Sequence, residues 1–158
     1  MKAVIQRVSE ASVTVDGQVV GAVGKGFLVL LGVMDGDTEA DADIMAAKVA
    51  KLRVFTDEND KMNLSVTDVD GEALCVSQFT LCADVKKGNR PSFTPSAAPA
   101  EAERLYEYFM RRLKAEGVRT VSHGVFGADM TVRLLNDGPV TILFDSKTWI
   151  GYREKDER

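Results

Sequence analysis

Apolar and polar residues alternate along this chain with two periods, and each period predicts a different kind of element. From residue 3 to residue 33, the run AVIQRVSEASVTVDGQVVGAVGKGFLVLLGV has the two-residue period of strands and predicts three of them. Asp16-Gly17 separates the first two runs, and this dipeptide favours the tight turn of a β-hairpin. A sheet therefore forms early in the sequence.

Two later segments have the spacing of amphipathic helices. The first covers about residues 38–52, with acids in its first turn and lysines later, as the helix dipole favours. The second begins near Pro99, a residue suited to a first helical turn, and stops at Gly117. Each helix has one apolar stripe that we expect to face the core: Met45, Val49 and Leu52 in the first, and Leu105, Phe109 and Leu113 in the second.

Strand patterns return between and after the helices. Arg53–Phe55 predicts a short strand, and the alternating run Glu72–Cys82 predicts a long one. VRTVS, DMTVRLL and VTILFD predict three more, the last two meeting at NDGPVT. Asp137-Gly138 favours a hairpin turn there, yet the following proline has no N–H for the second strand's ladder. The order of elements predicts an α+β fold with two main helices against a curled, barrel-like sheet, mostly antiparallel or mixed.

Composition narrows the classes of function. A chain of 158 residues that is 45% hydrophobic suits one globular core, which we assign to a single domain over residues 1–150, followed by a polar tail at 151–158. No apolar run approaches the roughly 18 residues that cross a bilayer. The opening MKAVIQRV lacks the apolar region of a secretory signal, so a cytoplasmic location is expected. The net charge of −4 argues against binding nucleic acid by bulk electrostatics.

Cysteine and histidine are too few for several kinds of site. Cys75 and Cys82 match no zinc or redox spacing, and on a regular strand they would point to opposite faces. We therefore expect free thiols, no metal and no cofactor. A serine or cysteine hydrolase would have to use His123, the only histidine, with Ser77 or a cysteine as nucleophile, yet no G-x-S-x-G elbow is present. A pair of glycosidase-type carboxylates is a weaker alternative, because no acidic residue lies in an apolar context.

Two segments carry candidate chemistry. One is the loop VKKGNRPSF, whose three cations are Lys86, Lys87 and Arg90. This local basic patch fits either phosphate contacts or an ordinary solvated loop. The other is ALCVSQFTLC, where polar Ser77, Gln78 and Thr80 interrupt an apolar run. A buried polar group without a partner costs about 1–3 kcal/mol, so these side chains need either hydrogen bonds to neighbouring strand ends or a functional role.

Two stretches of the sequence, one in the strand pattern at 72–82 and one around Pro139, resemble the motifs of a known family. SQFTL at 77–81 and NDGPVT at 136–141 are similar to the two signature motifs of D-aminoacyl-tRNA deacylases. KGNRPSF at 87–93, FGADM at 126–130 and the opening AVIQRV resemble the same family, so the likeness covers about residues 1–150. The resemblance implies a cofactor-free enzyme that hydrolyses the ester joining a D-amino acid, or mischarged glycine, to the 3′-terminal ribose of tRNA. The alternative is a non-catalytic RNA-binding or interaction module of the same fold.

The family likeness also addresses the proline in NDGPVT. It implies that the Gly138-Pro139 peptide is cis and that each subunit of a homodimer inserts it into the partner's pocket. The flanking carbonyl oxygens would then face the aminoacyl Cα, where an L side chain collides and a D side chain points away. Such a filter works by exclusion, so glycine would pass it.

The resemblance assigns the remaining roles. The catalytic residues it implies are Gln78, Phe79 and Thr80. Backbone N–H groups of Phe79 and Thr80 would form an oxyanion hole, and the Thr80 hydroxyl would orient the substrate rather than act as nucleophile. The residues implied to contact substrate are Ser77, Phe126, Met130, Gly138 and Pro139, although Phe126 and Met130 equally fit core packing. The cations Lys86, Lys87 and Arg90 would meet tRNA phosphates.

Overall fold

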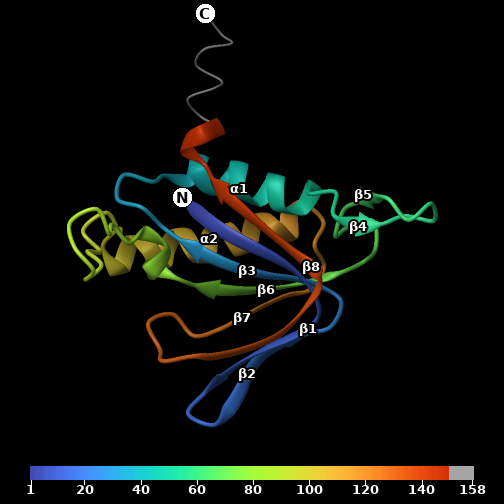
Figure 1. Cartoon of the computed structure of the whole chain (residues 1–158), viewed down its shortest axis with the longest axis horizontal. Coiled ribbons are helices and arrows are strands. Elements are labelled where there is room, and N and C mark those ends of the chain that lie inside the picture. The colour runs from blue at the N-terminus through green and yellow to red at the C-terminus, as the bar shows by residue number, and fades with distance from the viewer. Residues whose placement is uncertain (150–158) are drawn as a thin grey trace, which may run out of the picture.

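A computed structural model describes residues 1–149 (Figure 1). The predicted polar tail at 151–158 lies outside the described residues. Strands β1 (Lys2–Val15), β2 (Gln18–Val23) and β3 (Gly26–Gly32) confirm the three strands predicted at the start of the chain. The hairpin between β1 and β2 turns at Asp16 and Gly17, whose φ angles are 50° and 77°. Asp-Gly is favoured at this turn because both positions require positive φ.

Both predicted helices form. Helix α1 (Glu39–Lys51) begins after Thr38, whose backbone N–H donates to the Asp41 carboxylate at 2.9 Å. Helix α2 (Pro99–Ala115) has Pro99 in its first turn and is followed by Gly117 at a φ of 106°. The apolar stripe of α2 is buried, as predicted. No helix among residues 1–149 is long and apolar enough to cross a membrane.

The central predicted strand is shorter than expected. Strand β6 covers Glu72–Ser77, and residues Phe79–Cys82 form the 3-10 helix η1. The last bond to the neighbouring strand runs from the Gln78 N–H to the Leu31 carbonyl oxygen at 2.8 Å. Because β3 ends at Gly32, the residues beyond Gln78 have no strand to pair with, and the alternation in FTLC does not place side chains on two sheet faces. The predicted strand over Glu72–Cys82 was therefore wrong in its second half.

Other strands also shift. The predicted strand at Arg53–Phe55 forms at β4 (Phe55–Thr56), which pairs with β5 (Met62–Leu64) in a small hairpin. Only the end of VRTVS is a strand, β7 (Val121–His123). The two strands predicted on either side of NDGPVT are one continuous strand, β8 (Thr131–Asp145), because both halves pair with β1. The hairpin expected at Asp137-Gly138 was therefore wrong.

The main sheet is mixed and curled, as predicted. Its order is β2-β1-β3-β6-β7, with β8 also paired to β1. Strand β6 runs parallel to β3 and β7, and the other pairs are antiparallel. The Ser122 hydroxyl donates to the Ala22 carbonyl oxygen at 3.4 Å, so β7 lies beside β2 and the sheet nearly closes on itself. Both helices lie on one side of β1, β3 and β6 (Figure 1).

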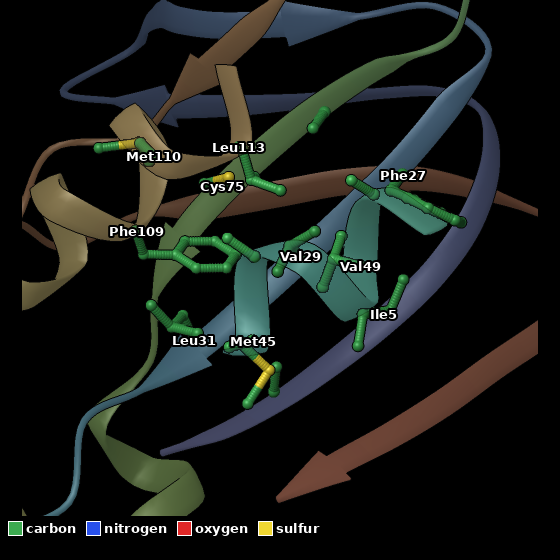
Figure 2. Close-up of a cluster of buried hydrophobic side chains, with 14 of the residues drawn as sticks. Ile5, Phe27, Val29, Leu31, Met45, Val49, Cys75, Phe109, Met110 and Leu113 are labelled. Atoms are coloured by element: carbon green, nitrogen blue, oxygen red, sulfur yellow. The ribbon is translucent and has the colours of Figure 1, made fainter. Parts of the chain in front are cut away.

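Two apolar clusters follow from this arrangement because strand side chains alternate between faces. On one face of β3, Phe27, Val29 and Leu31 pack against the helices, with Met45 and Phe109 close by (Figure 2). On the other face, Leu28 packs inside the curled sheet with residues of β1, β2 and β6, namely Val8, Ala11, Val13, Val23, Leu74 and Val76. Strands β3 and β6 are therefore buried on both faces and form the rigid centre of the molecule.

NDGPVT forms a bulge in the β1–β8 ladder. Gln6 is opposite Thr141 and Val8 is opposite Asn136, so residues 137–140 face Arg7 alone. Outside the ladder, Pro139 needs no N–H, which removes the conflict seen in the sequence. Gly138 has a φ of 132°, and a Cβ there would lie 2.8 Å from a Val140 methyl carbon, so only glycine fits. The Gly138-Pro139 peptide is cis.

Candidate active site

A hollow of about 720 Å³ opens where parallel strands end. Strands β3, β6 and β7 run in the same direction, so their carboxyl ends meet at one edge of the sheet. The loops that follow β6 and β7 lie together at this end of the molecule (Figure 1). Loops at the carboxyl ends of parallel strands are a common place for ligand sites. The topology therefore brings together segments that lie far apart in the sequence.

Besides Leu31 and Val33 at the end of β3, three segments line this hollow, which we call the main pocket. One is the end of β6 with the start of η1, which contributes Ser77, Gln78 and Phe79. The second is the segment from Phe93 into the first turns of α2, ending at Tyr106. The third is the β7–β8 connection, which contributes Phe126 and Met130. Five of the residues predicted to be functional thus meet in one cavity: Ser77, Gln78, Phe79, Phe126 and Met130.

Two aromatic contacts shape the walls. Phe79 is 56% exposed, and its ring centroid lies 5.0 Å from that of Phe93 in an edge-to-face contact. Tyr106 lies 6.1 Å from Phe126 and donates its hydroxyl to the Cys75 carbonyl oxygen at 2.8 Å. Burial raises the pKa of the Tyr106 phenol, so it stays neutral and acts as a hydrogen-bond donor to β6. An exposed aromatic beside a rigid aromatic wall suits stacking of a flat ligand.

Two backbone donors lie at the start of η1, next to Gln78 and Phe79, which line the main pocket. The first hydrogen bond of this short helix runs from the Leu81 N–H to the Gln78 carbonyl oxygen at 3.2 Å. The N–H groups of Phe79 and Thr80 precede that bond and are the orphan donors of a helix start. The Gln78 side-chain amide donates to the Thr80 hydroxyl. Thr80 itself is exposed and does not line the pocket, so its hydroxyl and the pocket are connected through Gln78.

The triad-type alternative loses support from these positions. Cys75 is completely buried, and burial raises the pKa of its thiol to about 12. His123 does not line the main pocket, and its Nδ1 lies 2.6 Å from the Gly124 carbonyl oxygen. No histidine therefore faces Ser77 across the pocket within residues 1–149.

The predicted basic loop lies beside the main pocket rather than in it. Asp84 and Ser92 close the loop with two backbone hydrogen bonds of 2.8 and 2.9 Å. The cations Lys86, Lys87 and Arg90 are exposed on it. Phe93, three residues after Arg90, lines the main pocket, whereas none of the three cations does.

Gly138 and Pro139 do not line the main pocket. Both are exposed on the β8 bulge, which two side chains hold in place. The Arg7 guanidinium donates to the Asp137 carbonyl oxygen at 3.1 Å and to the Val54 carbonyl oxygen at 2.6 Å. The Asn136 amide donates to the carbonyl oxygens of Arg7 and Val140, both at 2.9 Å. These side-chain hydrogen bonds hold the exposed bulge at residues 137–140 in place, and we call this bulge the projection.

Sequence reasoning missed Tyr106 and Arg7. Tyr106 flanks the apolar stripe of α2 and gives no signal of its own, apart from the need of a buried phenol for a hydrogen-bond partner. Arg7 lies in the opening AVIQRV, where a charged residue interrupts a strand that is otherwise half-buried. Its partner segments are 47 and 130 residues away, so only the folded chain shows what it binds.

Known proteins resemble this chain over nearly its whole length. A family model described as D-Tyr-tRNA(Tyr) deacylase matches residues 4–145. The chain is 63% identical over 145 residues to a D-aminoacyl-tRNA deacylase from Ruegeria pomeroyi, covering 92% of this chain and 99% of that protein. Identity to a D-aminoacyl-tRNA deacylase from Roseiflexus castenholzii is 56% over 158 residues, covering 100% of both.

Two solved structures have the same fold. One, named c-Myc DNA Unwinding Element Binding Protein, has a TM-score of 0.87 and 46% identity, covering 92% of this chain and 98% of that chain. The other, a probable eukaryotic D-amino acid tRNA deacylase, has a TM-score of 0.77 and 20% identity, covering 91% and 98%. At that identity the second likeness shows the fold alone.

Proposed function

This chain belongs to the D-aminoacyl-tRNA deacylase family of hydrolases, and from that membership we propose that it removes D-amino acids from tRNA in its main pocket. The observation that carries this proposal is the meeting of SQFTL and FGADM, which lie about 45 residues apart in the sequence, in the lining of one pocket. Their backbone donors and aromatic walls match an ester attached to a nucleoside. The product pair is a free D-amino acid and a tRNA with an unmodified 3′ end.

The proposed reaction is attack of water on the ester carbonyl carbon. The carbonyl oxygen becomes an oxyanion, which the Phe79 and Thr80 N–H groups stabilise. One such donor lowers the free energy of the transition state by about 3 kcal/mol. The bond between the carbonyl carbon and the ribose oxygen then breaks, and the ribose oxygen takes up the proton that the attacking water releases. Gln78 positions the terminal nucleotide or the water, and the neighbouring 2′-hydroxyl of the ribose assists. An aminoacyl ester is activated, so Thr80 need only orient groups through its bond to Gln78.

We propose that selectivity for D-amino acids comes from a second subunit. Gly138 and Pro139 are exposed and do not line the pocket of their own chain, which is what a projection serving a neighbouring pocket requires. The backbone of the partner's projection would occupy the space that an L side chain needs and leave room for a D side chain. Glycine lacks a side chain, so glycyl-tRNA should also be hydrolysed.

Strand β8 is the proposed surface between subunits. Within residues 1–149 it pairs with β1 alone, so one edge of a 15-residue strand is open. Its outer face exposes Leu135 at 55% and Leu143 at 75%. A long open edge with exposed leucines is a liability unless another chain covers it. A two-fold dimer through this face would present each projection to its partner.

The proposed contacts with tRNA include the basic loop. Replacing Lys86, Lys87 and Arg90 by glutamine should weaken tRNA binding and lower the slope of log affinity against log salt by about 2–3. The preference for D over L should not change, because the loop lies outside the main pocket. Glutamine at the exposed residues Lys51, Lys61 and Lys147 is the matched control. Equal weakening by the control would show that the loop has no special role.

The activity is tested with matched esters. Purified protein is incubated with D-tyrosyl-tRNA, L-tyrosyl-tRNA and glycyl-tRNA, and the loss of ester is followed. We expect hydrolysis of the D and glycyl esters and little hydrolysis of the L ester. If the D ester persists while tRNA binds, the chain is a nucleic-acid-binding module, as the name of the 46%-identical structure allows. Equal hydrolysis of D and L esters would refute exclusion by the projection.

The role of the dimer has its own test. Glutamate at Leu135 and Leu143 should yield folded monomers with greatly reduced hydrolysis of D-tyrosyl-tRNA, measured with light scattering and circular dichroism in parallel. Met62 is 60% exposed on the β4–β5 hairpin, so Met62→Glu is a matched control that should change neither property. A fully active monomer would rule out a shared site.

A further inference from the structure

A second hollow adjoins the main pocket and has no part in the reaction described above. It encloses about 430 Å³ between one side of α2 and the β7–β8 connection. Tyr106 and Phe126 line both cavities, so the two share a wall. The two cavities are therefore neighbours, separated by these two aromatic side chains.

The second hollow has an apolar floor and two charged zones. Val121 and Val125 lie on the β7 side, and Val125 is 44% exposed. Along α2, Glu103 lies about one turn before Tyr106 and Glu107 directly follows it, so both are near the wall shared with the main pocket. Two cations follow further along the same helix, Arg111 and Lys114. At 1.5 Å per residue, they lie about 7.5 and 12 Å beyond Tyr106 along the axis of α2.

These two cations differ from their neighbours on α2. Arg104 pairs with Glu101 at 2.7 Å, and Arg112 pairs with Asp43 at 3.1 Å. Within residues 1–149, neither Arg111 nor Lys114 forms an ion pair. The Arg111 guanidinium lies 5.8 Å from the centroid of the Tyr108 ring, a residue that does not itself line the second hollow. Both charges are exposed and available to an anion.

We propose that this second hollow is a subsite for the single-stranded nucleotides that precede the terminal adenosine of the substrate. The proposal rests on the proposed function, because that function puts the terminal nucleotide in the main pocket. A strand leaving that pocket past Tyr106 and Phe126 lays its next base on the apolar floor and its phosphates near Arg111 and Lys114. A positive track beside aromatic and apolar surface is the usual design for single-stranded nucleic acid.

The acidic zone gives this subsite a direction. Carboxylates repel phosphate but accept hydrogen bonds from the exocyclic amine of cytosine. Glu103 and Glu107 therefore suit the base of the nucleotide next to the adenosine, whereas its phosphates reach the basic zone. The basic loop at 86–90 is on a different segment and would meet the more distant duplex of the tRNA. The two basic regions thus make different predictions for substrates of different length.

The test is a series of substrates. The double variant Arg111→Gln with Lys114→Gln is compared with wild type on D-tyrosyl-adenosine, on D-tyrosyl-CCA trinucleotide and on D-tyrosyl-tRNA. We expect kcat/KM to fall roughly tenfold on the last two and to stay within about twofold on D-tyrosyl-adenosine, which has no upstream phosphate. The glutamine variant of the basic loop should lose activity on the full tRNA only. The control double variant, Lys48→Gln with Lys51→Gln on α1, removes the same charge elsewhere, and its kcat/KM should stay close to that of wild type on all three substrates.

A measurement on the wild-type protein does not depend on variants that fold. Adding unacylated CCA trinucleotide should shift the backbone amide NMR signals of Lys114, Val121 and Val125, whereas adenosine alone should shift only signals of the main pocket. The subsite is overturned if CCA leaves these signals unchanged, if the double variant loses equally on D-tyrosyl-adenosine, or if the control loses as much. If wild type hydrolyses none of the three esters, the proposed function itself fails and the subsite with it.

Discussion

Replacing Arg7 by alanine would release the projection on β8 from the body of the sheet. The Arg7 side chain is only 11% exposed and donates hydrogen bonds to the carbonyl oxygens of Val54 and Asp137. A hydrogen bond from a charged donor contributes about 1.5–3 kcal/mol. The two bonds therefore predict a loss of about 3 kcal/mol or more in the free energy of unfolding. The ion pair between Arg7 and the Asp137 carboxylate adds little to the free energy of unfolding, because that carboxylate is 57% exposed.

The same change should reduce chiral selectivity. Without Arg7, the Asp137 carbonyl oxygen loses its anchor, and the projection beside it is held only by Asn136 and the ladder. We expect the ratio of D-tyrosyl-tRNA to L-tyrosyl-tRNA hydrolysis to fall by about tenfold, which corresponds to about 1.4 kcal/mol of misplacement. Urea unfolding measures the stability change, with the m-value unchanged. Ester hydrolysis measures the selectivity.

Two further variants make the Arg7 result interpretable. Arg7→Lys keeps the charge but not the planar guanidinium group that reaches both carbonyl oxygens. We therefore expect losses of stability and of selectivity that are smaller than those of Arg7→Ala. Arg119→Ala removes an arginine whose side chain is 82% exposed, between α2 and β7 and away from β8, and should change neither quantity. The reasoning would be refuted if Arg7→Ala lost less than about 0.5 kcal/mol, the range of an ordinary surface substitution, and kept its selectivity.

Three other changes have defined outcomes. Thr80→Ala should lower kcat by less than about tenfold if the hydroxyl only orients Gln78, whereas loss of a nucleophile would cost several orders of magnitude in single-turnover kinetics. Asp37→Asn should destabilise the fold by about 3–5 kcal/mol in urea unfolding, because the buried Met1 ammonium loses a carboxylate partner 2.8 Å away; an unchanged midpoint would contradict this. The folded-state pKa of Cys75, about 12, lies above its unfolded value, so stability should be constant below about pH 8.5 and fall as the pH rises toward 12. Unfolding measured against pH should show a shallower fall in Cys75→Ala.

Local pattern predicted most of the elements. Helix α2 begins at Pro99 and stops before Gly117, as expected, because helix termini depend on backbone groups within one turn. The Asp16-Gly17 turn has the same local origin. The error at β6 shows the limit of pattern: FTLC keeps the alternation of a strand, yet β3 ends at Gly32 and offers no partner. A strand requires a second strand, which alternation alone does not reveal.

The same limit explains the two misjudged features of the candidate site. Asp137-Gly138 has the composition of a hairpin turn, but β1 is long enough to pair with β8 on both sides of it, and the pairing makes a bulge instead. Tyr106 has the spacing of a residue beside a core stripe, and only the position of β6 shows that its hydroxyl meets the Cys75 carbonyl oxygen at the pocket wall.

The sequence by itself determined which residues are chemically unusual: a glycine and proline in an apolar run, polar residues in a strand, and a basic loop in an acidic chain. These are properties of neighbours along the backbone, set by covalent geometry and by side-chain type. The tertiary structure alone decided that the ends of β6 and β7 form one pocket with α2, and that Gly138 and Pro139 stand away from it. The reason is that proximity between distant segments depends on which strands pair and where each one ends, and those choices minimise the exposed apolar surface of the whole chain rather than of any one segment.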